Sequence, residues 1–381
     1  MPLKLKTSDY AEATGVIRAI EKRLVGADAL ERALDAGSAA GALRALSQAG
    51  GYDFGSLARA ADYEGVLKRE LRNTYALLYK LSPDPDVVEI LGAKYDYHNV
   101  KASLKARYAS DGAARAASGS VAGVASGSTS GFASGAASGS ASSHASGSSE
   151  GAARAAPGIL YSVTRTPPQA VAEAVQSGDY RGLPALLADA AAQGAAAFEA
   201  AGAPGSIDLA LDRLMYADMR RRADRLGNGL ISEFTQKAID FYNLRSLFRV
   251  RSMGARADAR LLGSALADGG TLARGYFLDV FAIGAEAILA KLHYKHFGEA
   301  AKAAAEDHGR SGNYALLEKL ADDSLMGLAK RAKMVAFGPE PLFAYLYAKE
   351  TELKQIRVIA TGKLNHVPNE SIRKRLRGCY V

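Results

Sequence analysis

The sequence predicts an all-α protein. Nearly every stretch outside one Ala/Gly/Ser-rich segment places apolar residues at three- and four-residue steps, which is the period of an amphipathic helix. No convincing alternating apolar–polar run is present, so any strands are expected to be marginal. One helical pattern recurs three times along the 381 residues, which indicates three related helical units within one chain.

The predicted helices begin and end at recognisable residues. Residues 63–81 place their apolar side chains on one stripe, and the segment 82–85 (SPDP) stops this helix and starts the next. Proline cannot continue a helix but suits its first turn, and Asp84 or Ser82 is the expected N-cap. The full set of expected helices is 9–24, 63–81, 86–107, 207–226, 229–252, 275–297, 313–336 and 340–360.

One segment, residues 109–156, differs from the rest in composition. Of its 48 positions 39 are Ala, Gly or Ser, and the remaining side chains, such as Phe132 and His144, are too isolated to form a site. Glycine and serine oppose helix formation, and almost nothing large is available to bury. We therefore expect a flexible insert at 109–156, with helical repeat domains at 1–108, 157–254 and 255–381.

The internal repeat is carried by polar residues on three long helices. The first copy reads KYDYHNVKASLKARY (94–108), the second AIDFYNLRSLFRVRS (238–252), and the weaker third KETELKQIRVIATG (349–362). Each copy has an acid, then an amide three residues later, then a base two residues after the amide. The matched positions are Asp96, Asn99 and Lys101, then Asp240, Asn243 and Arg245, then Glu352, Gln355 and Arg357.

An acid and an amide three residues apart on a helix lie next to each other. In the second copy Asp240 and Asn243 lie beside an apolar face, where an acid, an amide and a base can close a hydrogen-bonded cluster between crossing helices. Such a cluster fixes helix register, because a buried charge without a partner is costly. Helix packing is the favoured interpretation, and contact of the basic members with a partner is the alternative. Three similar clusters do not suit a single catalytic centre.

Charge balance and cysteine content exclude several classes of protein. Lys and Arg number 48 against 40 Asp and Glu, and the net charge of +8 is spread without the dense basic stripe of a nucleic-acid binder. The basic clusters at 220–225, 330–333 and 373–377 lack interleaved aromatic residues, so we expect solvated helix faces or acidic protein partners there, and no nucleic acid. The single cysteine, Cys379, excludes an intrachain disulfide and a Cys-based zinc site, and is expected to be an unconstrained terminal thiol.

Catalytic and membrane-spanning signatures are missing. No signal peptide or run of about 18 apolar residues occurs, so the chain is not expected to cross a membrane. The motifs GxxxxGK[ST], GxGxxG and HExxH do not occur, and we expect no catalytic residues and no cofactor. His293, His296 and Glu299 stand three apart and could form a metal triad, although Lys291 and Lys295 oppose a divalent cation. No metal site is expected, and a metal-dependent helical enzyme using this triad is the alternative function.

The motifs around the repeat resemble a known family. Residues 94–101 match a Lys-Tyr-Asp-aromatic-His-Asn-apolar-Lys stretch, and residues 350–357 match a Glu-Asn/Thr-Glu-apolar-Lys/Arg-x-Ile-Arg stretch. An RxxExxLL-type helix at 18–24 and a Gly-Tyr pair at 51–52 are also similar. Their order and the threefold repeat resemble the C subunits of bacterial and archaeal V/A-type rotary ATPases and ATP synthases, which are equivalent to the d subunit of the eukaryotic vacuolar enzyme.

The resemblance covers nearly all of 1–108 and 157–381; the Ala/Gly/Ser insert departs from the family's pattern, and the C-terminal RLRGCYV is a less familiar ending. It implies three similar helical bundles arranged as a funnel about a pseudo-threefold axis. It also implies a non-catalytic rotor subunit that lies on the cytoplasmic side of the membrane as a peripheral protein. Its partners would be the central-stalk subunits of D and F type, the membrane proteolipid ring and other subunits of the ATPase. The chain would then couple ATP synthesis or hydrolysis to the transport of protons or sodium ions.

Overall fold

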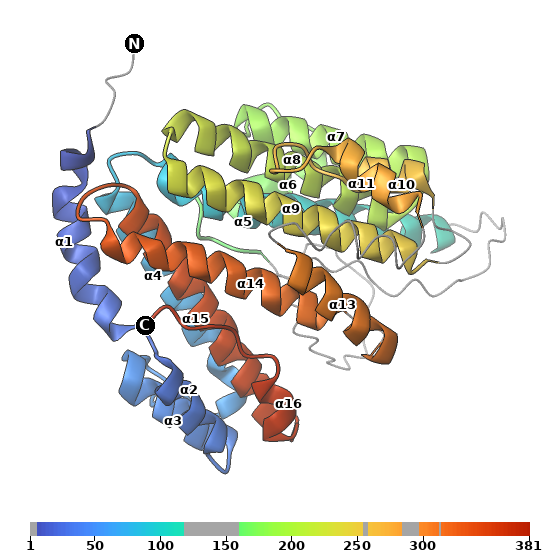
Figure 1. The fold of residues 1–381 in the computed structure, drawn as a ribbon. Helices are drawn as coiled ribbons and strands as arrows, with labels where there is room; N and C mark the ends of the chain where they lie inside the picture. Colours follow the sequence, from blue (N-terminus) through green and yellow to red (C-terminus); the bar gives the residue numbers. More distant parts are fainter. Residues whose placement is uncertain (1–5, 118–159, 254–257, 284–296, 312–313) are drawn as a thin grey trace. The chain divides into compact units, whose positions relative to one another are not determined.

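The computed structural model describes residues 6–117, 160–253, 258–283, 297–311 and 314–381. Within these ranges every regular element is an α-helix or a short 3-10 helix, which confirms the all-α prediction (Figure 1). Among the described residues, no helix combines the length and the hydropathy that a membrane crossing requires.

Internal contacts divide the chain into two units. One unit joins Met1–Leu91 to Met219–Val381, and the other is Gly92–Asp218. Helices α5 (Asp86–Ala117) and α8 (Pro204–Leu226) each contribute residues to both units. The three-domain division expected from the repeat stays a prediction.

The larger unit is built around α15. Residues along almost the whole of this helix are buried, because α1, α3, α4 and α14 pack around it. A second core forms where Leu244 and Leu247 of α9 meet Leu262 of α10 and Phe277 of α11. The helices of this unit are α1 (Ala11–Ile20), α2 (Ala27–Asp35), α3 (Ala39–Gly50), α4 (Tyr63–Leu81), α9 (Gly229–Arg251), α10 (Ala259–Ala265), α11 (Arg274–Phe281), α13 (Gly298–Ser311), α14 (Ala315–Lys330), α15 (Glu340–Leu364) and α16 (Asn369–Arg373). Its 3-10 helices are η1 (Thr7–Tyr10), η2 (Glu21–Arg23), η3 (Ala60–Asp62) and η5 (Arg331–Met334).

The smaller unit packs α6 (Pro168–Ser177) and α7 (Ala185–Ala201) with its own parts of α5 and α8. Gly194 on α7 allows a close approach, because a Cβ at this position would lie 2.7 Å from Leu104 Cδ1 and 3.1 Å from Leu211 Cδ1. The absence of a side chain therefore lets α7 pack tightly against both α5 and α8.

The boundaries of the long helices agree closely with the sequence pattern. The helix expected at 63–81 is α4, and the one expected at 229–252 is α9. Asp84 Oδ1 accepts a hydrogen bond of 2.9 Å from Asp86 N, which confirms the expected cap of α5. Asn228 caps α9 in the same way by accepting from Ile231 N at 3.1 Å.

Several boundaries differ from the expectation, and the helix expected at 9–24 is divided into η1, α1 and η2. Helix α5 continues through 109–117, so the first part of the expected flexible insert is helical, because its alanines favour helix and the Ser/Gly alternation starts only afterwards. The helix expected at 313–336 becomes α-helix only to Lys330, followed by η5. Of the helix expected at 275–297, residues 284–296 lie outside the described part of the chain, as do residues 118–156 of the insert.

Candidate functional site

The three copies of the repeated polar pattern lie on α5, α9 and α15. In the first copy the Asn99 amide pairs with both backbone groups of one residue: Nδ2 donates to Tyr161 O at 2.8 Å, and Oδ1 accepts from Tyr161 N at 2.9 Å. Three residues further on, Thr164 Oγ1 donates to Asp96 Oδ1 at 2.5 Å. The acid and the amide of α5 therefore hold the extended segment that leads into α6.

The second copy repeats this arrangement on α9. Asn243 Nδ2 donates to Ala267 O at 2.9 Å, and Oδ1 accepts from Ala267 N at 2.8 Å. Asp240 accepts from the hydroxyl of Thr271, from Thr271 N at 3.1 Å and from Leu272 N at 3.2 Å. Burial raises the pKa of Asp240, and these three hydrogen bonds oppose the rise. Both side chains are fully buried, so their hydrogen bonds fix the segment before α11 to α9 in the interior.

The third copy, on α15, binds a segment from the opposite end of the chain. Glu352 accepts from the backbone N–H of Val25 and from the hydroxyl of Tyr52, and Lys349 Nζ donates to its Oε1 at 2.8 Å. Burial, followed by the charge of Glu352, raises the pKa of Tyr52 well above its usual value. Burial alone would lower the pKa of Lys349, but Glu352 and Glu70 hold it above its usual value.

The amide of the third copy is the point at which the repeat breaks down. Gln355 Nε2 lies 3.9 Å from Cys379 Sγ, and Gln355 Oε1 has no hydrogen-bond partner in the described part of the chain. Glutamine is one methylene longer than asparagine, and the two-bond pairing with a backbone residue is not reproduced here. Cys379, expected to be unconstrained, is half-buried here, and burial raises the pKa of its thiol.

The basic members of the three copies form ion pairs in a cyclic order. Lys101 of α5 pairs with Asp212 of α8. Arg245 of α9 lies 3.6 Å from Glu318 of α14, and Arg357 of α15 donates to Glu64 of α4 at 2.6 and 3.0 Å. Along the chain, α4 and α5, α8 and α9, and α14 and α15 form three pairs, and the two helices of each pair follow one another in the sequence. The second helix of each pair is therefore joined to the first helix of the next, and the last pair returns to the first.

The connections within these three helix pairs lie close together in the larger unit. Arg222 and Arg225, at the end of α8, both bond Asp86 at the start of α5, at 3.0 and 2.9 Å. Asn228, between α8 and α9, donates to Glu340 Oε1 at the start of α15 at 2.7 Å. The acidic residues in the first turns of α5 and α15 suit the positive ends of these helices. The cluster at 220–225 was expected to form a solvated face or to contact an acidic partner, but Arg222 and Arg225 bind Asp86 of this same chain.

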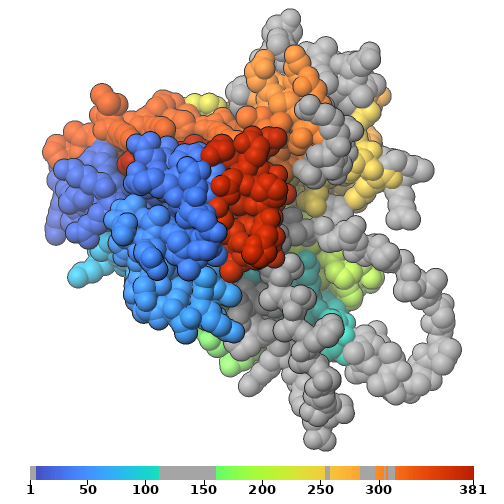
Figure 2. Space-filling model, turned by 90° about the horizontal axis from the view of Figure 1, so that it is seen from below, coloured from blue at the N-terminus to red at the C-terminus, as the bar shows by residue number. Residues whose placement is uncertain are grey.

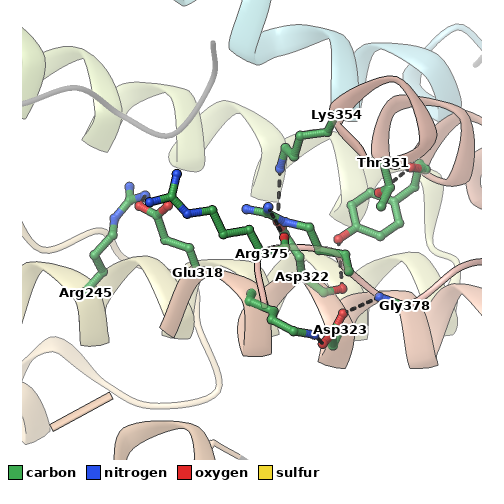
Figure 3. Close-up of polar contacts among 11 residues, drawn as sticks. Arg245, Glu318, Asp322, Asp323, Thr351, Lys354, Arg375 and Gly378 are labelled. Carbon is green, nitrogen blue, oxygen red and sulfur yellow. Dashed lines mark hydrogen bonds and ion pairs between the residues drawn. The ribbon is translucent and has the colours of Figure 1, made fainter. Parts of the chain in front are cut away.

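Neighbouring acids on α14 join α15 to the C-terminal segment (Figure 3). Asp322 accepts from Lys354 Nζ at 3.1 Å and from Arg377 Nε at 2.9 Å, and the neighbouring Asp323 accepts from Gly378 N at 2.6 Å. Burial alone would raise the pKa of Asp322, but Lys354 and Arg377 hold it below its usual value. With Glu318 one helical turn earlier, these acids make α14 the electrostatic link between α9 and α15.

Other candidate residues of the sequence are placed as follows. His293 and His296 lie outside the described residues, and Glu299 is exposed on α13. In the described part of the chain no group of three or more His, Cys, Asp or Glu side chains is arranged to hold a metal ion.

Sequence reasoning did not identify the partners of the repeated residues. The acids that bind the three bases stand at no common spacing from the turns, so no motif marks them. A signal was present for the two threonines: each lies three or four residues after the backbone residue that pairs with the asparagine. This signal becomes visible only when the segments after α5 and α9 are aligned with each other.

Comparisons with known proteins give one consistent result. A family model described as ATP synthase (C/AC39) subunit matches residues 13–120 and 148–375. The C subunit of the V-type sodium ATPase of Enterococcus hirae is 24% identical over 375 residues, which cover 98% of this chain and 99% of the relative. The C subunit of the A-type ATP synthase of Haloferax volcanii is 28% identical over 171 residues, 44% of this chain and 47% of the relative. That of Methanocaldococcus jannaschii is 25% identical over 173 residues, 44% and 43% of the two chains. The family match spans all three copies of the repeated helix.

Proposed function

This chain belongs to the family of ATP synthase (C/AC39) subunits, as a C subunit of the V/A-type ATPases, and on that premise we propose that it is the coupling socket of the rotor. In this role it seats on the membrane proteolipid ring and receives the central-stalk subunits of D and F type. It catalyses no reaction itself, and it transmits torque so that ATP synthesis or hydrolysis drives, or is driven by, the transport of protons or sodium ions. It acts as a peripheral protein on the cytoplasmic side of the membrane.

The cyclic order of the three ion pairs carries this proposal. A part that transmits torque must resist twisting, and densely packed helices transmit strain because they are hard to compress. Lys101, Arg245 and Arg357 each join a helix of one pair to a helix of the next pair. This closed succession supports three similar bundles about a pseudo-threefold axis, the arrangement that a socket for an axial shaft requires.

The proposal is tested by separating nucleotide hydrolysis from ion transport. Membrane vesicles from cells that lack this chain should retain the other ATPase subunits but show no ATP-driven ion uptake, and the wild-type chain should restore it. Affinity-tagged chain should co-purify with the D- and F-type subunits and with the proteolipid ring. Ion uptake at the wild-type rate without this chain would refute a coupling role.

A charge-reversal pair provides a sharper version of the same experiment. Arg357→Glu places two acids opposite each other between α15 and α4, so ion uptake per ATP hydrolysed should fall. Adding Glu64→Arg to the same chain restores an opposite-charge pair and should restore coupling. Loss in the single variant without recovery in the double variant would show that this contact does not join the helix pairs as proposed.

A further inference from the structure

The connection between α14 and α15 differs from the two equivalent connections. The α4–α5 connection (82–85) and the α8–α9 connection (227–228) are short and contain no large apolar side chain. The third connection, residues 331–339 (RAKMVAFGP), is longer and carries Met334 and Phe337, which are 90% and 55% exposed. These are two of the three large hydrophobic side chains that are exposed in the described part of the chain.

The loop is held in one conformation although its tip is exposed. Arg18 Nη2 donates to three of its carbonyl oxygens, those of Ala332 at 2.8 Å, Lys333 at 3.2 Å and Val335 at 2.9 Å. Arg18 is itself oriented by Glu21, at 3.0 and 3.1 Å. The loop therefore lies fixed beside α1 (Figure 1). A preorganised loop loses little conformational entropy when it binds, so little binding free energy is lost when Met334 and Phe337 contact a partner.

Positive charge surrounds the two apolar side chains. Lys330, Arg331 and Lys333 are exposed, and no acid occurs between residues 330 and 339. Two of these cations have titratable neighbours: Glu233 pairs with Arg331 at 2.7 Å, and Lys333 Nζ lies 4.7 Å from the ring centroid of Tyr380. Glu340 follows the loop but is bonded to Asn228. The exposed tip is thus apolar and its rim is cationic.

We infer that residues 330–337 form a membrane-contacting loop, in which Met334 and Phe337 enter the interface of an anionic lipid bilayer and Lys330 and Lys333 bind its headgroups. Apolar side chains flanked by lysine are the combination that binds lipid interfaces, where buried apolar area and attraction to anionic lipid add. The centre of a protein–protein interface is instead depleted of lysine. The two side chains are exposed on a single loop. This inference goes beyond the proposed socket and does not depend on it.

Vesicle flotation with the purified full-length chain tests the inference. Binding should be strong to phosphatidylcholine vesicles that contain phosphatidylglycerol, weak to pure phosphatidylcholine, and should decrease as salt is raised. Met334→Ser with Phe337→Ser should lower the partition coefficient by on the order of tenfold for each side chain. The control is Val381→Ser, which removes the third exposed hydrophobic side chain, 44% exposed, and should bind like wild type.

The charges are tested separately. Lys330→Gln with Lys333→Gln should lower the partition coefficient by about 30-fold, since each lysine near an anionic surface contributes about 1 kcal/mol, or about fivefold. Arg32→Gln with Arg44→Gln removes the same charge from exposed positions on α2 and α3 and should have little effect. Equal losses in both charge variants would show a non-specific effect of net charge and would overturn the inference.

Wild-type chain that stays with the aqueous phase at every lipid composition would also overturn it. If the Met334/Phe337 double variant then also fails to enter the ATPase complex, the loop is a contact for an acidic protein surface and not for lipid. Because flotation uses none of the other ATPase subunits, its result is independent of the coupling experiment. Unchanged melting temperatures of all variants, expected because the substituted side chains are exposed, establish that they are folded.

Discussion

The two-bond pairing of Asn243 with Ala267 predicts a large and specific loss of stability when the amide is removed. Asn243 is fully buried, and Ala267 is 1% exposed. In Asn243→Leu the size of the side chain is nearly kept, but the N–H and C=O of Ala267 lose their partners and no water can reach them. A buried polar group without a partner costs about 1–3 kcal/mol, so two should lower the free energy of unfolding by about 2–4 kcal/mol after partial relaxation.

The third copy provides a matched control at the equivalent position. Gln355 is also buried, but its Oε1 has no partner in the described chain and its Nε2 makes only a 3.9 Å contact with sulfur. Gln355→Met keeps the length of the side chain and removes a poorly satisfied amide. The free energy of unfolding should stay within about 1 kcal/mol of wild type.

Urea unfolding followed by circular dichroism compares the two variants. The midpoint should fall in Asn243→Leu at an unchanged m-value and should hardly move in Gln355→Met. Leucine is a better helix former than asparagine, so helix propensity works against the expected loss and cannot produce it. Equal destabilisation by the two variants would refute the reasoning, because it would assign the effect to packing at this helix position and not to the paired backbone groups.

Three further predictions concern other internal contacts. Lys101→Met should cost about 3–5 kcal/mol because it leaves Asp212 buried and unpaired, and adding Asp212→Leu should recover most of the melting temperature; no recovery would contradict the ion pair. The lowered pKa of Asp322 gives the folded protein stability above the usual pKa of an aspartate, which is lost as the pH falls through the lowered value. In Asp322→Asn the free energy of unfolding should therefore decrease less steeply as the pH is lowered, and an unchanged pH dependence at acid pH would contradict this. Gly194→Ala should destabilise by about 1–3 kcal/mol through overlap with its leucine neighbours, whereas Gly327→Ala, in open space on α14, should stabilise by up to about 1 kcal/mol in thermal unfolding; effects of the same sign would contradict the packing.

The sequence was sufficient for the long helices and for the recurrence of a polar pattern, because both are local in the chain. The apolar period located α4 and α9, and the turn residues located the cap at Asp84. Helix α5 extended further than expected because alanine favours helix even next to a glycine- and serine-rich segment. Local rules thus predicted the long helices, whereas helices α2, α3, α6, α7, α10 and α13 lie outside the expected helical ranges.

The partners of the polar residues could not be predicted because they lie far away in the chain. Asn99 binds a residue 62 positions later, and Glu352 binds residues about 300 positions earlier. Arg222 belongs to a run of arginines that is typical of a solvated face, yet its position on the turn nearest α5 brings it to Asp86. Charge patterns along one helix do not show which other helix lies opposite, and this requires the tertiary arrangement.

The number of residues between the bonded positions also explains why the third copy is built differently from the second. Asn243 closes a loop of 24 residues, whereas Glu352 holds Val25 across 327 residues. The entropic cost of closure grows as about (3/2)RT ln n, so the longer closure costs about 2 kcal/mol more. A carboxylate that accepts hydrogen bonds from Val25 and Tyr52 beside a buried lysine is stronger than a neutral amide pair, since hydrogen bonds to charged groups contribute about 1.5–3 kcal/mol. The ion pairs of Arg373 with Glu31 add to this closure, and Figure 2 shows the C-terminal segment packed against α2 and α3. In the third copy, where α15 binds residues near the beginning of the chain, a charged hydrogen-bond network therefore replaces the pairing of an amide with a backbone residue.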